Sequence, residues 1–181
     1  NVHCMPSSVD LAHFARGRDA SLEHPALAGI AHPRLGFYGV IDERLDIGLV
    51  AALADAQPDW QVCLVGPVVK IDPAQLPQRP NLHYVPQLAY DELPAMLAGW
   101  DVCLLPFAHN ESTQFISPTK TLEYLAAGKP VVTTSIRDVV TPYGDSGLVH
   151  VADSPEAFAQ ALEAALEQAS DRAWLQRVDA M

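Results

Sequence analysis

The sequence predicts an α/β domain of the doubly wound, Rossmann-like class, built on a parallel sheet of about six strands. Short runs rich in Val and Leu alternate along the chain with longer amphipathic segments. Most of these runs are apolar throughout, which is typical of strands covered by helices on both faces. The length, 181 residues, suits one such domain or one lobe of a two-domain protein.

Six runs are predicted to be the strands because they are short, apolar and bounded by turn-forming residues. They cover 35–40, 62–67, 82–86, 101–107, 130–135 and 148–152. Right-handed connections between parallel strands would place helices on both faces of the sheet. The stretch 70–81 holds three prolines and is expected to be a loop or one irregular turn.

The helices are predicted from apolar residues that recur at helical spacing and from capping residues at their ends. They cover 46–57, 90–100 and 117–127, a segment opening at Ser154, and a C-terminal segment within 171–181. Ser117 followed by Pro118 is typical of an N-cap and a first helical turn, so one helix is expected to begin there.

The loop 107–119 is the strongest candidate for a binding site, because open α/β sheets bind ligands where their strands end. The start of the helix that follows offers unpaired N–H groups, and Lys120 adds a positive charge, so the loop is predicted to bind phosphate. Glu123 lies one turn further on the same face and suits the two hydroxyls of a ribose. These features predict a nucleoside diphosphate. In the structural alternative, which stays open, Ser117 only caps the helix and Lys120 is only solvated, and Glu123 forms a salt bridge with Lys120 instead of binding a ribose.

The charge balance argues against several classes of partner. With 11 Lys and Arg against 22 Asp and Glu, the net charge of −11 does not favour nucleic acid or an anionic membrane surface. No apolar run approaches the ~18 residues of a membrane span, and the first residues lack the pattern of a signal peptide. Three distant cysteines, Cys4, Cys63 and Cys103, favour a reducing compartment, so a cytoplasmic location is expected. The seven histidines lack metal-binding spacing, so no metal site is predicted.

The segment SPTKTLEYLAAGKPVVTTS, residues 117–135, resembles the nucleotide-sugar-binding C-terminal domain of group 1, family 4 glycosyltransferases, which have the GT-B fold. The core E-Y-L-A-A-G-K-P-V-V carries the resemblance most specifically. The segments FYGVIDERLD, PDWQVCLVGP, 81–107 and 144–162 are similar to other parts of that domain. The string MPSSVDLAHF resembles the hinge that joins the two domains of the family. The resemblance covers roughly residues 4–168.

The resemblance implies a role for each residue that matches the family's donor site. Glu123 matches the second glutamate of a Glu-x7-Glu pair and is implied to hold the ribose. Phe115 stands where the first glutamate is usual, and Asn110 and Glu111 are the candidates to replace it at the donor sugar. Val40 stands where the family tends to carry an arginine.

A second group of residues is implied to hold the diphosphate and the base. Asp46 stands where the family tends to carry a lysine, so Arg44, the only cation of that loop, is expected to act on the diphosphate together with Lys120. We expect these two to be catalytic, because they would neutralise the charge of the leaving diphosphate. The other implied binding residues are Gly39 in the first loop, Ser117, Pro118 and Thr119 at the diphosphate, and Gln87 and Leu88 at the base.

The implied function is that of the donor-binding half of a glycosyltransferase, which transfers a sugar from a nucleoside-diphosphate sugar to an unknown acceptor. Residues 1–33 are expected to be the interdomain hinge, 34–168 the donor domain and 169–181 a C-terminal helix. The acceptor would be bound by an N-terminal domain missing from this chain, so the chain alone is expected to be inactive. The resemblance also implies a retaining, metal-independent reaction without a cofactor. Two alternatives stay open: a GT-B epimerase or hydrolase, and a silent module that binds a nucleotide or a partner.

Overall fold

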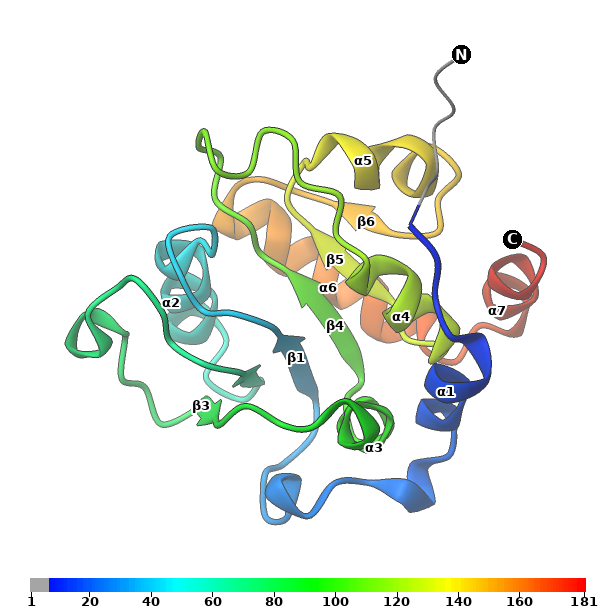
Figure 1. Cartoon of the computed structure of the whole chain (residues 1–181), viewed down its shortest axis with the longest axis horizontal. Coiled ribbons are helices and arrows are strands. Elements are labelled where there is room, and N and C mark those ends of the chain that lie inside the picture. Colours follow the sequence, from blue (N-terminus) through cyan, green and yellow to red (C-terminus); the bar gives the residue numbers. More distant parts are fainter. Residues whose placement is uncertain (1–6) are drawn as a thin grey trace.

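A parallel six-stranded sheet forms the centre of the computed structural model, which describes residues 7–181 (Figure 1). The strands lie in the order β3-β2-β1-β4-β5-β6, and each pairs in parallel with its neighbours. Their bounds are β1 Arg34–Tyr38, β2 Gln61–Val65, β3 Leu82–Val85, β4 Val102–Leu105, β5 Val131–Thr133 and β6 His150–Val151. The predicted α/β, doubly wound class is confirmed, and every strand falls within or overlaps a predicted run.

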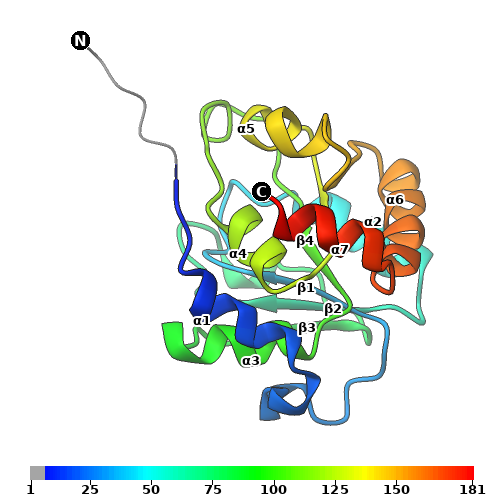
Figure 2. The ribbon, with the colours of Figure 1, turned by 90° about the vertical axis from the view of Figure 1, so that its right-hand side faces the viewer.

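Helices cover both faces of the sheet (Figure 2). Helices α2 (Ile47–Ala56) and α6 (Pro155–Gln168) lie on one face. Helices α1 (Leu11–Ala15), α3 (Leu93–Ala98) and α4 (Lys120–Ala126) lie on the other face. The remaining helices are α5 Arg137–Val139, a π-turn Val140–Gly144 and α7 Arg172–Asp179, which packs against α4. Short 3-10 turns lie at Arg16–Arg18, Ala20–Leu22, Pro25–Leu27, Pro73–Gln75 and Tyr90–Glu92.

Two of the predicted helix starts are confirmed by their caps. The Asp46 side chain accepts a hydrogen bond from the N–H of Leu49 at 2.8 Å and begins α2. The Ser154 side chain likewise accepts a hydrogen bond from the N–H of Ala157 at 3.2 Å, and α6 begins there with Pro155 in its first turn. These side chains satisfy N–H groups that have no partner inside the helix.

The predicted helix start at Ser117 is wrong, because α4 begins at Lys120. Thr119 is the residue before the helix, its backbone is already helical, and it makes no side-chain cap. The chain forms a turn directly before the helix, in which the Thr121 N–H donates a hydrogen bond to the Pro118 carbonyl. Ser117 therefore precedes this turn and its side chain is exposed, not capping.

Residues 7–33 pack against the domain through a few apolar side chains. Phe14 of α1 is 1% exposed, and Leu27 is fully buried. Arg34, at the start of β1, forms an ion pair with Glu23 at 2.9 Å. These contacts tie the segment to α3, α4 and the sheet; residues 1–6, which include the first part of the predicted hinge, lie outside the described residues.

The core of the sheet is apolar and closely packed, with β1 and β4 buried along their whole length. Cys63 and Cys103 are buried in β2 and β4, as small core residues, and burial raises the pKa of the Cys63 thiol to about 12. Among residues 7–181, no helix combines the length and the apolarity that crossing a membrane requires. Since β1 and β4 are neighbours whose connections run to β2 and β5 on either side, a crevice is expected where these two strands end.

Candidate functional site

A cavity of about 380 Å³ opens where β1 and β4 end. We call it the basic cavity. It is lined by Phe37, Val40 and Arg44 from the β1 side and by Phe107, Ile116, Ser117, Pro118, Thr119 and Lys120 from the β4 side. The cavity thus brings together five of the residues predicted from the sequence, at the edge of the sheet where ligands bind in this class of fold.

Lys120 places a positive charge in the basic cavity without a carboxylate partner among residues 7–181. Its side chain packs on Gly39, where an added Cβ would lie 2.6 Å from Lys120 Cε. Its Nζ lies 6.0 Å from the centroid of the Phe37 ring. Burial lowers the pKa of Lys120, and the positive charge of Arg44 lowers it further, while Glu123 opposes the shift. The free chain therefore holds this charge at an energetic cost that an anion would remove.

Arg44 reaches the same cavity while it is held by Asp42. The Arg44 Nη2 donates to Asp42 Oδ2 at 2.7 Å, and its Nε lies 3.0 Å from both carboxylate oxygens. Asp42 is only 2% exposed, and burial favours its neutral form; the hydrogen bonds from Arg44 outweigh this, so the pKa of Asp42 stays below its usual value. The pair fixes the guanidinium in a two-pronged geometry. The predicted cation is thus in place, and Asp42 is a functional neighbour that the sequence reasoning missed.

The lining of the basic cavity contains two cations, Arg44 and Lys120, and no acidic side chain, on a chain whose net charge is −11. Within residues 7–181, no hydrogen bond engages the backbone N–H groups of Ser117, Thr119 or Lys120. Charged and N–H donors that converge on one cavity are the groups that bind phosphate. The arrangement suits an anionic group with several oxygen atoms.

A second, smaller cavity of about 190 Å³ adjoins the first and shares Val40 with it. We call it the apolar cavity; it is lined by Tyr38, Gly39, Val40, Val65, Gly66, Pro67, Gln87, Leu88 and Leu93. The predicted base-site residues Gln87 and Leu88, and Gly39, are therefore brought together. The β1 and β2 loops touch here: Gly66 has φ +141, and an added Cβ would lie 2.0 Å from the Gly39 carbonyl oxygen. Only glycine allows this close approach.

Glu123 is not among the residues that line either of these two cavities. Its Oε2 instead accepts a hydrogen bond from the Tyr38 hydroxyl at 2.5 Å, and Tyr38 lines the apolar cavity. Glu123 as a residue is partly buried and partly exposed. No salt bridge joins Glu123 to Lys120 among the described residues, so the salt-bridge alternative for Glu123 finds no support there.

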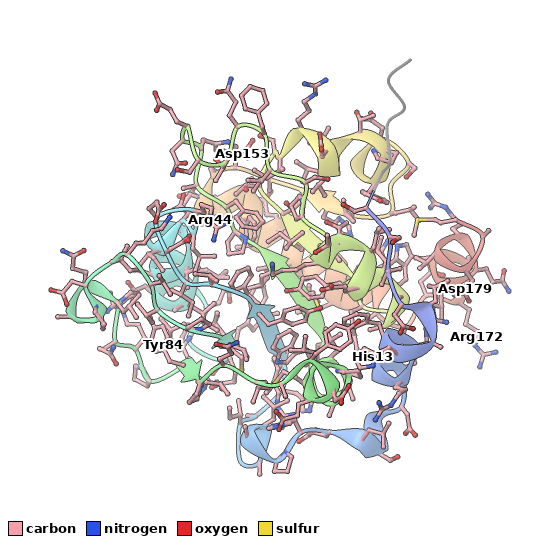
Figure 3. All side chains as sticks on the ribbon, in the orientation of Figure 1. His13, Arg44, Tyr84, Asp153, Arg172 and Asp179 are labelled. Atoms are coloured by element: carbon pink, nitrogen blue, oxygen red, sulfur yellow. The ribbon has the colours of Figure 1, made fainter. Side chains whose placement is uncertain are left out.

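A third cavity, of about 350 Å³, holds the two residues proposed to replace the absent glutamate, Asn110 and Glu111. We call it the polar cavity; it is lined by His109, Asn110, Glu111, Thr113, Gln114, Ser135, Ile136 and Arg137. Asp153 adjoins it and accepts hydrogen bonds from His109 and from the Ser135 N–H. Arg44 and Asp153 both lie at the edge of the sheet where the strands end (Figure 3). Asn110 and Glu111 therefore lie on a different cavity from Lys120.

Phe115 lies in the same loop, between Gln114, which lines the polar cavity, and Ile116, which lines the basic cavity. Its side chain is 80% exposed. The loop itself is fixed by Thr113, which is 3% exposed and whose hydroxyl contacts the Ala108 and Asn110 carbonyls. The aromatic ring is thus held at the surface by an ordered loop.

Two contributors to the site, Tyr38 and Asp42, were missed by the sequence reasoning. Tyr38 lies within a predicted apolar strand, and its partner Glu123 lies 85 residues away along the chain. Asp42 stands two residues before Arg44, and this spacing in a turn was a signal that could have been used. Among residues 7–181, no group of three or more His, Cys, Asp or Glu side chains is arranged to hold a metal ion.

Comparison with known proteins gives consistent matches. The model of the family described as glycosyl transferases group 1 matches residues 32–168. A protein of Bacillus subtilis (strain 168) named as a teichuronic acid biosynthesis glycosyltransferase, TuaH, is 30% identical over 138 residues, which are 75% of this chain and 34% of TuaH.

Solved structures show the same fold. The glycosyltransferase WaaG, involved in lipopolysaccharide biosynthesis, has a TM-score of 0.61 at 22% identity, over 96% of this chain and 49% of WaaG. Anabaena HepE, solved in complex with UDP and glucose, has a TM-score of 0.58 at 16% identity, over 90% of this chain and 50% of HepE. The chain thus spans half or less of the length of these relatives. The family match over most of the sheet and its helices shows that the chain belongs to the group 1 glycosyltransferases.

Proposed function

We propose that this chain is the donor-binding half of a glycosyltransferase and binds a nucleoside-diphosphate sugar across the basic and apolar cavities. The diphosphate would lie in the basic cavity on Lys120 and Arg44, and the base would lie in the apolar cavity beside Gln87 and Leu88. The ribose would span the two cavities at Val40 and reach Glu123.

One observation carries the proposal: Lys120 is a partly buried cation without an ionic partner among the described residues, and it lines a cavity without an acidic side chain. An isolated charge in such a place costs free energy unless a ligand of opposite charge binds there. The adjoining apolar cavity adds room for a group that is flat and weakly polar, as a nucleobase is. HepE, with a similar fold, was solved with UDP and glucose.

The proposed chemistry follows from where charge develops. When the bond between the sugar and the diphosphate breaks, negative charge grows on the leaving phosphate oxygens. Lys120 and Arg44, fixed beforehand by Gly39 and Asp42, would stabilise that charge more than they stabilise the intact donor. The two cations would do this without a metal ion. Transfer with retention of configuration at the sugar is a further expectation from the family resemblance.

The acceptor is proposed to bind outside this chain. Relatives such as WaaG and TuaH are about twice as long as this chain, so the remainder of a full-length protein has room for a second domain. The names of these relatives connect them with the biosynthesis of teichuronic acid and of lipopolysaccharide. A carbohydrate or lipid-linked carbohydrate acceptor is the corresponding proposal for the parent protein.

Thermal unfolding with added nucleotides tests the proposal directly. UDP, GDP and ADP at millimolar concentration are each compared with the matching nucleoside and with inorganic pyrophosphate. At least one nucleoside diphosphate should raise the Tm, because a ligand that binds only the folded state stabilises it by mass action. The nucleoside alone should shift it less. No shift with any of the three diphosphates would overturn the proposal.

The variant Glu123→Ala tests the assignment of the ribose. We expect weaker nucleotide binding by about 1.5–3 kcal/mol, the usual loss for hydrogen bonds to a charged group. Glu163→Ala is the matched control, because Glu163 is an exposed glutamate of α6 on the opposite face of the sheet. Circular dichroism checks that both variants keep the fold. Equal affinities of the two variants would contradict the assignment.

A further inference from the structure

Tyr38 is the structural link between the apolar cavity and Glu123. It is the last residue of β1, it lines the cavity, and its hydroxyl lies 2.5 Å from Glu123 Oε2. Glu123 itself does not line that cavity or the basic one. Tyr38 therefore connects the lining of the apolar cavity with the carboxylate of Glu123.

The Tyr38 hydroxyl is held in place by the packing of its ring. The ring stacks on Trp100, with centroids 6.1 Å apart, and meets the edge of Tyr124 at 5.0 Å. The Tyr38 N–H also donates to the Tyr124 hydroxyl at 3.2 Å. With only 5% of Tyr38 exposed, this side chain has little freedom to move. Burial raises the pKa of Tyr38, and the neighbouring Tyr124 and Glu123 add to the shift, so the hydroxyl remains a proton donor.

The contact leaves part of the carboxylate available. An ionised carboxylate can accept about four hydrogen bonds through its two oxygens. Tyr38 uses one position on Oε2, and no donor within residues 7–181 is hydrogen-bonded to Oε1. A hydrogen bond to a charged acceptor is short and directional, so it fixes the carboxylate plane as well as its position.

We propose that Tyr38 is a positioning residue: its hydroxyl orients the carboxylate of Glu123 so that the free oxygen accepts a ribose hydroxyl of the bound nucleotide. This inference rests on the proposed function, since it specifies how that site distinguishes a ribonucleotide from a nucleotide that lacks the ribose hydroxyls. Tyr38 acts here through Glu123 and makes no contact with the reacting atoms.

The test compares two ligands on two variants of the full chain. Isothermal titration measures the Kd of UDP, GDP or ADP, whichever binds best, and of its 2′,3′-dideoxy counterpart. Wild type should prefer the ribonucleotide. The variant Tyr38→Phe keeps the packed ring and removes only the hydroxyl, and should lower this preference about fivefold, mainly by weakening the ribonucleotide. A merely structural role would weaken both ligands equally.

Matched controls isolate the contact. Tyr84→Phe removes another hydroxyl that donates a hydrogen bond, to the Pro77 carbonyl at 2.9 Å, in a strand away from Arg44 (Figure 3), and should leave the preference unchanged. In a Glu123→Ala background, which leaves no side-chain oxygen to accept from Tyr38, Tyr38→Phe should not lower the preference further. An unchanged or increased preference in Tyr38→Phe would overturn the inference alone. If wild type binds none of the three nucleotides, the proposed function itself fails.

Discussion

At the scale of single residues, the two cations of the site differ in whether they have an ionic partner. Arg44 is paired and fixed by Asp42, whereas Lys120 has no ionic partner among the described residues. The sequence nominated Lys120 from its place at a helix start after a strand, and the family resemblance nominated Arg44 as the only cation of its loop. The sequence could not show the contact between Tyr38 and Glu123, because these two residues lie 85 positions apart and meet only after the chain has folded.

The unpartnered charge of Lys120 predicts a trade-off between stability and binding. Burial lowers the pKa of Lys120, so the unfolded chain binds more protons between that pKa and the usual value of about 10.4. Stability of the folded chain therefore rises as pH increases through this window. The variant Lys120→Met should raise the Tm at neutral pH, and the gain over wild type should shrink as pH approaches 10.

The same variant should lose most of the nucleotide-induced shift in Tm, with a weakening of about tenfold or more. Lys70→Met is the matched control. Lys70 is an exposed lysine in the loop after β2, and it lines neither the basic nor the apolar cavity. Both variants remove one positive charge, so a general charge effect would appear in both. An equal loss in the two variants would show that Lys120 has no special place in binding.

At the scale of the elements, periodicity located the strands and helices well, but local capping patterns misled at one place. Ser117-Pro118 and Ser154-Pro155 are the same dipeptide in the sequence, yet only Ser154 caps a helix. The two serines differ in their surroundings: residues 116–118 have no regular secondary structure and line the basic cavity, whereas Ser154 lies three residues after β6 and directly before α6. A local pattern does not encode such a constraint.

This contrast predicts different costs for two identical substitutions. Ser154→Ala removes the cap of α6 and should lower the free energy of unfolding by about 1 kcal/mol. Ser117→Ala removes no cap and should change it by less than about 0.5 kcal/mol. Urea unfolding of both variants measures the difference. A cost for Ser117→Ala as large as that for Ser154→Ala would mean that Ser117 caps α4 in solution.

At the scale of the whole molecule, the parallel direction of the strands followed from the alternation of apolar runs with helical segments, whereas the strand order β3-β2-β1-β4-β5-β6 is known only from the structure. Residues 7–33 escaped that reasoning, because they pack through short turns with few apolar residues, such as Phe14 and Leu27, instead of a long periodic helix. Their expected role as a hinge stays a prediction. The contacts they make show that the described part of the segment is part of the folded body.

Removing one of these contacts should therefore cost global stability. Phe14→Ala should lower the free energy of unfolding by about 3–5 kcal/mol, as for other fully buried aromatic residues. Leu11, in the same helix, is 64% exposed, and Leu11→Ala should cost less than about 0.5 kcal/mol. Chemical denaturation of the two variants makes the comparison. A negligible cost for Phe14→Ala would show that the segment is detached in solution.

The two cations of the basic cavity belong to a molecule whose total charge is −11, and this contrast has a kinetic consequence. A diphosphate that approaches from a distance is repelled by the net negative charge of the chain. It is attracted only near the opening of the basic cavity, where Arg44 and Lys120 lie. Added salt screens the long-range repulsion, with a screening length of about 10 Å at 0.1 M, and screens the short-range attraction much less. Stopped-flow measurements should therefore show association that becomes faster between 0.01 and 0.1 M salt, the reverse of ordinary electrostatic steering. Capture would then be slowest in dilute buffer and would improve at the ionic strength of a cell.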